Sequence, residues 1–185
     1  MKITYNSPVV LSFVIISGLV LLVGKITGDL ITESLFMTYP SSLMNPLTYI
    51  RMFTHVLGHA SFSHYLNNML MFVLLGPMLE EKYGSKRIII VILATAFVTS
   101  FINNVFTGNG LLGASGVVFS FIVLASMTSF NEGEIPMTFI LVMVFYLGQE
   151  VLNGLTSFDN ISQMAHLIGG CCGAICGYAF KSKII

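Results

Sequence analysis

Long apolar runs are the feature that most restricts what this chain can fold into. Six of them stand between short polar stretches. Each is close to the ~20 residues that a helix needs to cross ~30 Å of hydrocarbon. Their approximate bounds are 8–24, 65–79, 88–106, 111–130, 135–155 and 161–180. Because backbone polar groups in lipid must be satisfied within a helix or a closed barrel, the runs predict six membrane-spanning helices. We therefore expect an all-α membrane protein with a single domain over residues 1–185.

Composition supports a membrane location and argues against nucleic acid as a partner. The 185 residues are 55% hydrophobic and only 9% charged, whereas soluble domains are nearer ~25% charged. The 8 basic and 8 acidic residues cancel, so no global basic field attracts a phosphate backbone. Three cysteines lie in the last apolar run, and this odd number argues against a disulfide framework. We expect membrane lipids, and no nucleic acid, as partners.

The positive charges predict how the chain is oriented. If the N-terminus is cytoplasmic, two of the eight Lys and Arg residues, Lys25 and Arg51, fall outside. The remaining six fall inside: Lys2, Lys82, Lys86, Arg87, Lys181 and Lys183. Cytoplasmic segments carry an excess of Lys and Arg, so this distribution predicts that both termini lie inside.

That orientation brings polar residues from three runs to one depth. Ser115 begins the fourth run just after an outer segment, and His166 lies about 9 Å below the outer boundary by helix rise. His64 and Asn68, at the outer start of the second run, are four residues apart and share a helix face. Intramembrane polar groups are costly and usually mark function. Each alone has a structural interpretation, since a serine among small residues suits close helix packing.

Serine, histidine and hydrogen-bond donors together can perform nucleophilic acyl transfer. A serine hydroxyl becomes a nucleophile when an imidazole takes its proton, and the resulting oxyanion needs donors aimed at it. His166 can act as the base for Ser115. The backbone N–H of Ser115, the His64 ring and the Asn68 amide can act as donors. With no acidic residue near His166 in the sequence, a dyad is simpler than a triad.

Three short motifs resemble those of the rhomboid intramembrane serine proteases. They are His64-Tyr-Leu-Asn-Asn68, Gly113-Ala-Ser-Gly116 and Ala165-His-Leu-Ile-Gly169, in this order on the second, fourth and sixth runs. The resemblance implies a six-helix bundle with a catalytic Ser115–His166 dyad and an oxyanion held by His64 and Asn68. It also implies transmembrane proteins as substrates, cleavage near the outer face, and no metal or organic cofactor.

Other positions match the family as well. Residues 30–60 resemble the family's first outer loop, which lies partly in the outer leaflet. His55 and His59 match positions there that make structural hydrogen bonds, and Glu80 matches a structural hydrogen-bond anchor. In the last run a glycine recurs every fourth residue, at Gly169, Gly173 and Gly177. We expect this stripe of small residues to let the serine-bearing helix come close.

Some positions depart from the family. Ile50-Arg51 stands where a Trp-Arg pair is common. Phe119 stands where a tyrosine often packs against the catalytic histidine, so the stacking surface is kept and the hydroxyl is lost. Gln149 and Glu150 lie in the run that resembles the element proposed to gate substrate access, where they either border a cavity or join helices.

Two other classes of protein compete with a protease. His55, His59 and His64 could form a metal site, but Val56 stands where a His-Glu-x-x-His metalloprotease has its glutamate. The chain could also be an inactive rhomboid-like protein that binds transmembrane helices, although both the nucleophile and the base are retained. A transporter is not favoured, since no internal repeat is found. A short chain without a transit-like leader favours a prokaryotic plasma membrane.

Overall fold

The computed structural model describes residues 4–128, 134–148 and 161–181. These residues form helices and one isolated β-bridge, joining Thr38 and Leu111. The short 3-10 helix η1 continues α3, and the π-helical segment η2 continues α7. In chain order the elements are α1 (Pro8–Ile26), α2 (Leu30–Leu35), α3 (Pro46–Thr54), η1 (His55–Leu57), α4 (Phe62–Tyr83), α5 (Ser85–Phe106), α6 (Ser115–Ser126), α7 (Met137–Leu141), η2 (Val142–Leu147) and α9 (Ile161–Lys181).

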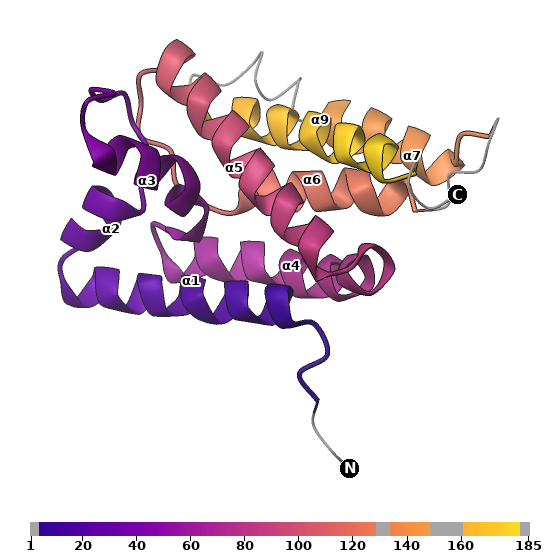
Figure 1. Ribbon diagram of the computed structural model, residues 1–185, viewed down its shortest axis with the longest axis horizontal. Coiled ribbons are helices and arrows are strands. Elements are labelled where there is room, and N and C mark those ends of the chain that lie inside the picture. Colours follow the sequence, from indigo (N-terminus) through magenta and orange to yellow (C-terminus); the bar gives the residue numbers. More distant parts are fainter. Residues whose placement is uncertain (1–3, 129–133, 149–160, 182–185) are drawn as a thin grey trace.

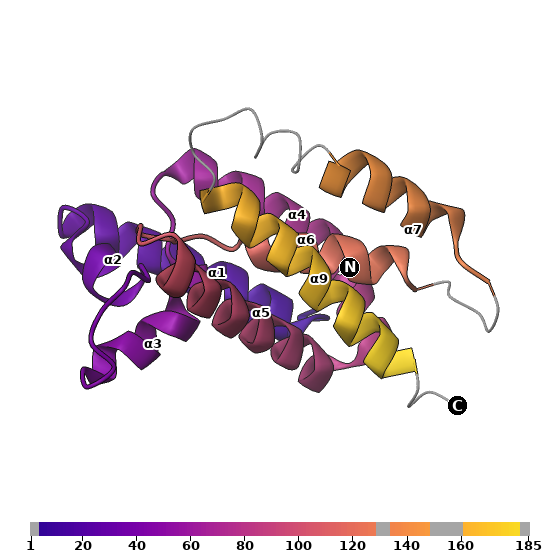
Figure 2. The same cartoon turned by 90° about the horizontal axis from the view of Figure 1, so that it is seen from above.

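The long helices form one bundle in which neighbours in the chain run in opposite directions. Figure 1 shows α4, α6 and α9 beginning at the end of the bundle that carries α2 and α3, which we call the loop end. Helices α1 and α5 run the other way and finish there. Seen from above, α7 lies at the periphery, set apart from α1 and α5 (Figure 2). The all-α bundle predicted from the apolar runs is confirmed.

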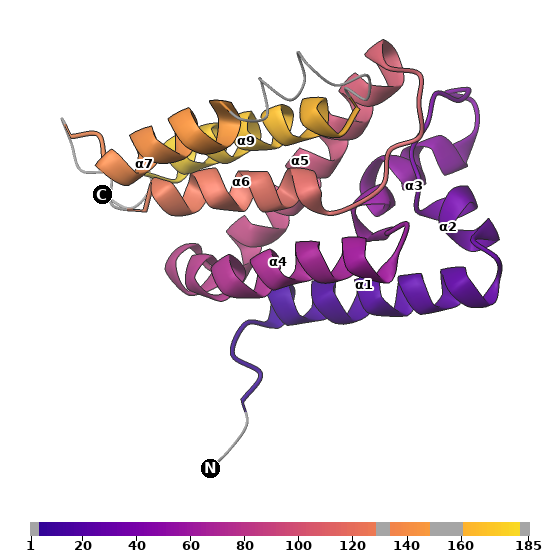
Figure 3. The same cartoon turned by 180° about the vertical axis from the view of Figure 1, so that it is seen from behind.

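Helix α6 lies in the middle of the bundle and is almost entirely buried. Its Phe121 packs on Phe72 of α4, with ring centroids 4.8 Å apart, and Phe72 in turn stacks on Phe13 of α1 at 4.4 Å. Figure 3 shows α6 lying between α4 and α9. A residue at the start of α6 is therefore held on a helix that is packed on several sides, which limits its movement.

Large apolar side chains on the outer helices point away from this core. Leu19 on α1 is 56% exposed and Ile90 on α5 is 52% exposed, as expected for surfaces that face lipid. Within the described ranges, α1 and α5 are the two helices long and apolar enough to cross a membrane by themselves, and α6 is a shorter apolar helix. The number of six spans therefore stays a prediction.

The helix expected from Leu111 begins only at Ser115. Leu111 instead exchanges two backbone hydrogen bonds with Thr38, at 2.8 and 2.9 Å. Gly113 has a φ of 122°, a conformation that side chains other than hydrogen disfavour. The apolar run thus enters the bundle as an extended loop, and hydropathy alone does not reveal this difference. Of the other runs, the second differs most at its ends, because α4 reaches from Phe62 to Tyr83. Residues 149–155 of the fifth predicted run lie outside the described residues.

Glu80 joins the start of α1 to the turn between α4 and α5, as the sequence predicted for a hydrogen-bond anchor. Its carboxylate is 5% exposed and accepts bonds from the backbone N–H groups of Val9 and Val10, both at 3.1 Å. It also accepts one from the Ser85 hydroxyl at 2.7 Å. A carboxylate at a helix N-terminus satisfies unpaired N–H groups and complements the helix dipole.

We expect Glu80→Gln to lower the free energy of unfolding by about 2–4 kcal/mol. The amide nitrogen would face a backbone donor, and charge-assisted bonds contribute about 1.5–3 kcal/mol each in a buried site. The measurement is thermal or denaturant unfolding in detergent. Glu81→Gln is the matched control because Glu81 is exposed. Equal stability of the two variants would contradict this anchoring role.

Candidate active site

Ser115 is the first residue of α6, and the loop before it is held by backbone bonds. The Gly113 N–H donates to the carbonyl of His55 at 2.9 Å, which connects this loop to η1. Ser115 is half-buried at the loop end of the bundle. The N–H groups in the first turn of a helix have no partner within the helix, so the start of α6 presents donors and a positive dipole end beside Ser115.

His166 lies on α9 with its ring against α6. Its imidazole stacks on the ring of Phe119, with centroids 4.3 Å apart and an angle of 7° between the planes. Phe119 follows Ser115 by four residues and so lies on the same face of α6. The stacking predicted for Phe119 is confirmed, and it puts His166 on the helix face that carries Ser115.

Glycines let α9 approach α6 at backbone distance. A Cβ placed on Gly169 would lie 2.0 Å from the carbonyl oxygen of Gly116, and one on Gly173 would lie 2.3 Å from that of Ser120. Gly177 also lies close to α6, but its neighbour is the side chain of Met127 and not backbone. The predicted stripe of small residues is confirmed. Because Gly116 follows Ser115 directly, the contact with Gly169 lies beside the serine.

His64 lies over the loop that precedes Ser115. A Cβ on Gly113 would come within 2.8 Å of both Nε2 and Cε1 of the His64 ring, so only glycine allows the ring to lie so close. Asn68 is 7% exposed, and its Nδ2 donates to the His64 carbonyl at 3.0 Å. The structure thus brings His64 and Asn68 together on one face of α4.

His59 is buried behind His64 and holds no charge at neutral pH. Its ring meets the His64 ring edge to face at a centroid distance of 5.0 Å, and its Nδ1 pairs with the Leu57 carbonyl at 3.2 Å. Burial lowers the pKa of His59 to about 4, with a further contribution from His64. This histidine therefore contributes packing and hydrogen bonding in its neutral form, as the sequence predicted.

His55 has the structural role that the sequence predicted and an additional one. Its ring is 1% exposed, with Nδ1 3.3 Å from the Arg51 carbonyl and Nε2 3.5 Å from the Thr99 hydroxyl. Its backbone carbonyl is the acceptor that holds Gly113. No sequence pattern reveals that second role because any residue has a carbonyl. Burial lowers the pKa of His55 to about 4.

Stability should fall as the pH decreases from about 6.5 to about 4. The unfolded state protonates His55 near pH 6.5, whereas the folded state resists until about pH 4, so acid favours unfolding in this window. For His55 alone the loss reaches about 3 kcal/mol below pH 4. The measurement is the thermal midpoint in detergent at several pH values, for the wild type and His55→Gln. An equally steep pH dependence in both would contradict this assignment.

A polar network that sequence reasoning missed fastens the first loop to α5. The Thr38 hydroxyl pairs with that of Ser100 at 2.9 Å, and the Asn104 amide donates to the same hydroxyl at 3.0 Å. Together with the bridge to Leu111, this network fixes the loop that leads to Ser115. The sequence did not predict this network, because hydroxyl-bearing residues scattered along an apolar helix show no pattern that indicates contacts with a distant loop.

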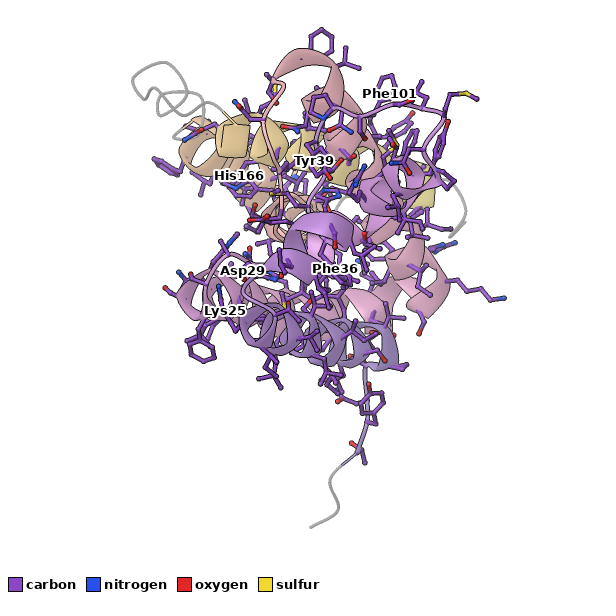
Figure 4. The ribbon with its side chains drawn as sticks, turned by 90° about the vertical axis from the view of Figure 1, so that its left-hand side faces the viewer. Lys25, Asp29, Phe36, Tyr39, Phe101 and His166 are labelled. Atoms are coloured by element: carbon purple, nitrogen blue, oxygen red, sulfur yellow. The ribbon has the colours of Figure 1, made fainter. Side chains whose placement is uncertain are left out.

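Arg51 organises the first loop from a buried position. Its guanidinium donates to the Tyr39 hydroxyl at 2.8 Å and to the Ser41 hydroxyl at 2.9 Å, and it lies 4.3 Å from the centre of the Tyr39 ring. Figure 4 looks onto the loop end and shows Tyr39 and His166 at a similar height, with Lys25 below them. Arg51 therefore makes these contacts within the first loop although the residue before it is Ile50 and not the tryptophan common in the family.

The three histidines that the sequence offered as metal ligands are not brought together as a set. His55 faces Thr99, whereas His59 faces His64, because η1 is not an α-helix and residues 55 and 59 do not share a face. Among the residues that the structure describes, no group of three or more possible metal ligands occurs. Gln149 and Glu150 lie outside the described residues.

The sequence model of the Rhomboid domain matches residues 46–183. This range covers 138 of the 185 residues, counting 46 and 183. It includes α3, η1 and every later element, and with them His64, Asn68, Ser115 and His166.

Proposed function

Because this chain belongs to the rhomboid family of intramembrane serine proteases, we propose that it hydrolyses peptide bonds in or near transmembrane segments of membrane proteins. Family membership supports a membrane location and membrane-protein substrates in general. The more specific part of the proposal is the identity of the catalytic residues. We assign the nucleophile to Ser115 and the general base to His166.

The observation that carries this proposal is the stack of His166 on Phe119. With a centroid distance of 4.3 Å and nearly parallel planes, it orients the imidazole along the face of α6 that begins with Ser115. A ring nitrogen takes the hydroxyl proton as the serine oxygen attacks the substrate carbonyl carbon. The same nitrogen returns the proton to the leaving amine when the peptide C–N bond breaks. Water then repeats the sequence and releases the acyl group from Ser115.

The negative oxygen of the tetrahedral intermediate requires donors around Ser115. We assign this role to the backbone N–H of Ser115, the His64 ring and the Asn68 amide. The position of His64 against Gly113 and the dipole at the start of α6 support the assignment. Such preorganised donors often make the largest single contribution to an enzymatic rate.

The substrate must present an accessible carbonyl at the loop end. A transmembrane helix keeps its carbonyls hydrogen-bonded, so the segment to be cut must unwind locally. We therefore infer a preference for Gly, Ala or other helix-weakening residues. We also propose six spans with both termini inside, a site toward the outer surface, and a prokaryotic plasma membrane as the location.

A serine-reactive fluorophosphonate tests the assignment directly. The purified protein in detergent should be labelled, and labelling should disappear in Ser115→Ala and in His166→Ala. Loss in both shows that the serine depends on the histidine. Ser120→Ala is a suitable control, since Ser120 is buried one turn further along α6 and should leave labelling unchanged.

The opposite outcomes are equally clear. Labelling that persists in Ser115→Ala assigns the nucleophile elsewhere. A wild-type protein that neither reacts nor cleaves, yet binds transmembrane helices, is the inactive rhomboid-like protein that the sequence left open.

A further inference from the structure

A groove of about 460 Å³ lies between α1 and α5, on the part of the molecule away from α7. Figure 1 shows these two helices diverging toward the loop end, where α3 lies between them. The end of α3 and the helix η1 close the groove on that side through Phe53, Val56 and Leu57. The volume falls within the ~300–1,000 Å³ of small-molecule sites.

The chemistry of the lining restricts what can bind there. Apart from Ser12, every side chain along the groove is apolar. The Ser12 hydroxyl already pairs with the Tyr5 hydroxyl at 3.0 Å. A ligand in the groove therefore has to be a hydrocarbon, because a polar ligand would find no partners to replace those it had in water.

One end of the groove lies close to the starts of α1 and α5, and an exposed lysine occurs on α5 just before it. Pro8 and Ile89 line it, and they stand close to the starts of α1 and α5. Lys86 is exposed on α5, and its spacing of three and seven residues from Ile89 and Leu93 puts it on the same helix face as these lining residues. An ammonium group is thus available at the level of the headgroups, directly before the apolar groove.

We propose that this groove binds one acyl chain of an anionic phospholipid, whose phosphate lies beside Lys86. The lipid belongs to the leaflet at whose surface α1 and α5 begin. A protein helix is a poorer fit, because one 5.4 Å turn of a helix 10–12 Å wide occupies ~400–600 Å³ and would fill the groove. A single hydrocarbon chain can instead extend along it.

The bound chain contacts the helix that supports the candidate active site. Val56 and Leu57 close the groove, and they follow His55, whose carbonyl holds Gly113 at 2.9 Å. The acyl chain therefore packs against η1, the same helix to which the loop before Ser115 is attached. This connection is independent of the catalytic assignment.

Native mass spectrometry of the full chain in detergent tests the proposal, with phosphatidylglycerol and phosphatidylcholine as probes. We expect one phosphatidylglycerol per chain. Ser12→Phe should reduce its binding by more than tenfold, because a buried methylene contributes a factor of about four and the new ring displaces several. Leu22→Phe, at an exposed position of α1 away from the groove, should leave binding unchanged.

The charge is tested separately from the groove. Lys86→Gln should weaken phosphatidylglycerol binding about fivefold and leave phosphatidylcholine binding unchanged. The matched control is Lys82→Gln, which removes the same charge from a side chain that reaches the Thr128 carbonyl instead. Equal effects of the two variants would overturn the role of Lys86.

A second variant that fills the groove is needed in case Ser12→Phe misfolds. Ile89→Trp narrows the groove from α5, where the side chain is 43% exposed and tolerates a larger group. Both filling variants should keep the wild-type thermal midpoint in lipid-free detergent. Unchanged phosphatidylglycerol binding in both would overturn the proposal. If the wild type forms a dimer and both variants are monomers, the proposal is also overturned, because the groove then binds a second copy of the chain.

Discussion

Replacing Ser115 or His166 with alanine should slow substrate cleavage by about 10⁴- to 10⁶-fold. The serine is a weak nucleophile without the imidazole, and the imidazole has no chemical step without the serine. In the proposed dyad the two residues act as one unit, so the double variant should be no slower than either single one. The measurement is the rate at which a fluorogenic transmembrane substrate is cleaved in liposomes.

Two comparisons make this result specific. Ser115→Ala should keep the wild-type thermal midpoint, because Ser115 is only half-buried and the change removes a single oxygen atom. Asn68→Ala should lose less activity, about 10²- to 10³-fold, since the other oxyanion donors stay in place. A Ser115→Ala variant that cleaves within tenfold of the wild type would refute the nucleophile assignment.

Gly169→Ala should reduce kcat at least about 100-fold. The added methyl carbon would lie 2.0 Å from the Gly116 carbonyl oxygen, and backbone cannot move aside as a flexible side chain does. The two helices must separate, which shifts His166, one turn earlier on α9, relative to Ser115. A displacement of ~1 Å between reacting groups costs about 10² in rate. The measurement is again cleavage kinetics in liposomes.

Gly173→Ala distinguishes a shifted dyad from a weakened bundle. Its added carbon also meets α6 backbone, 2.3 Å from the Ser120 oxygen, but one turn further from His166. Both variants should lose similar stability, about 1–3 kcal/mol, while Gly169→Ala loses more activity. Gly148→Ala, with open space around the added carbon, should match the wild type. Equal activity of Gly169→Ala and Gly173→Ala would contradict a local effect on the dyad.

Much of the fold could be predicted because lipid imposes a simple rule on sequence. Every apolar run has to satisfy its own backbone, so runs of suitable length become helices. The glycine spacing on α9 predicted that another helix comes close, since only small residues allow such an approach, and the family resemblance implied that this helix is the one that carries Ser115. The stacking of Phe119 on His166 was implied by the family resemblance, in which an aromatic residue at this position packs against the histidine.

The loop before Ser115 could not be predicted in the same way. Leu111 reads as the start of an apolar helix, yet its backbone pairs with Thr38, about 70 residues away. The carbonyl of His55 holds Gly113, and a backbone carbonyl carries no sequence signal. These bonds depend on tertiary arrangement, so side-chain patterns alone do not reveal them.

The backbone contact between α6 and α9 has a consequence for how the protein responds to its bilayer. Where side chains separate two helices, rotamer changes can absorb a change in lateral pressure or membrane thickness. At Gly169 and Gly173 no side chain intervenes, so the pair behaves as one stiff unit. We therefore expect a change in bilayer thickness to alter the relative positions of these two helices less than those of helices whose contacts are made by side chains.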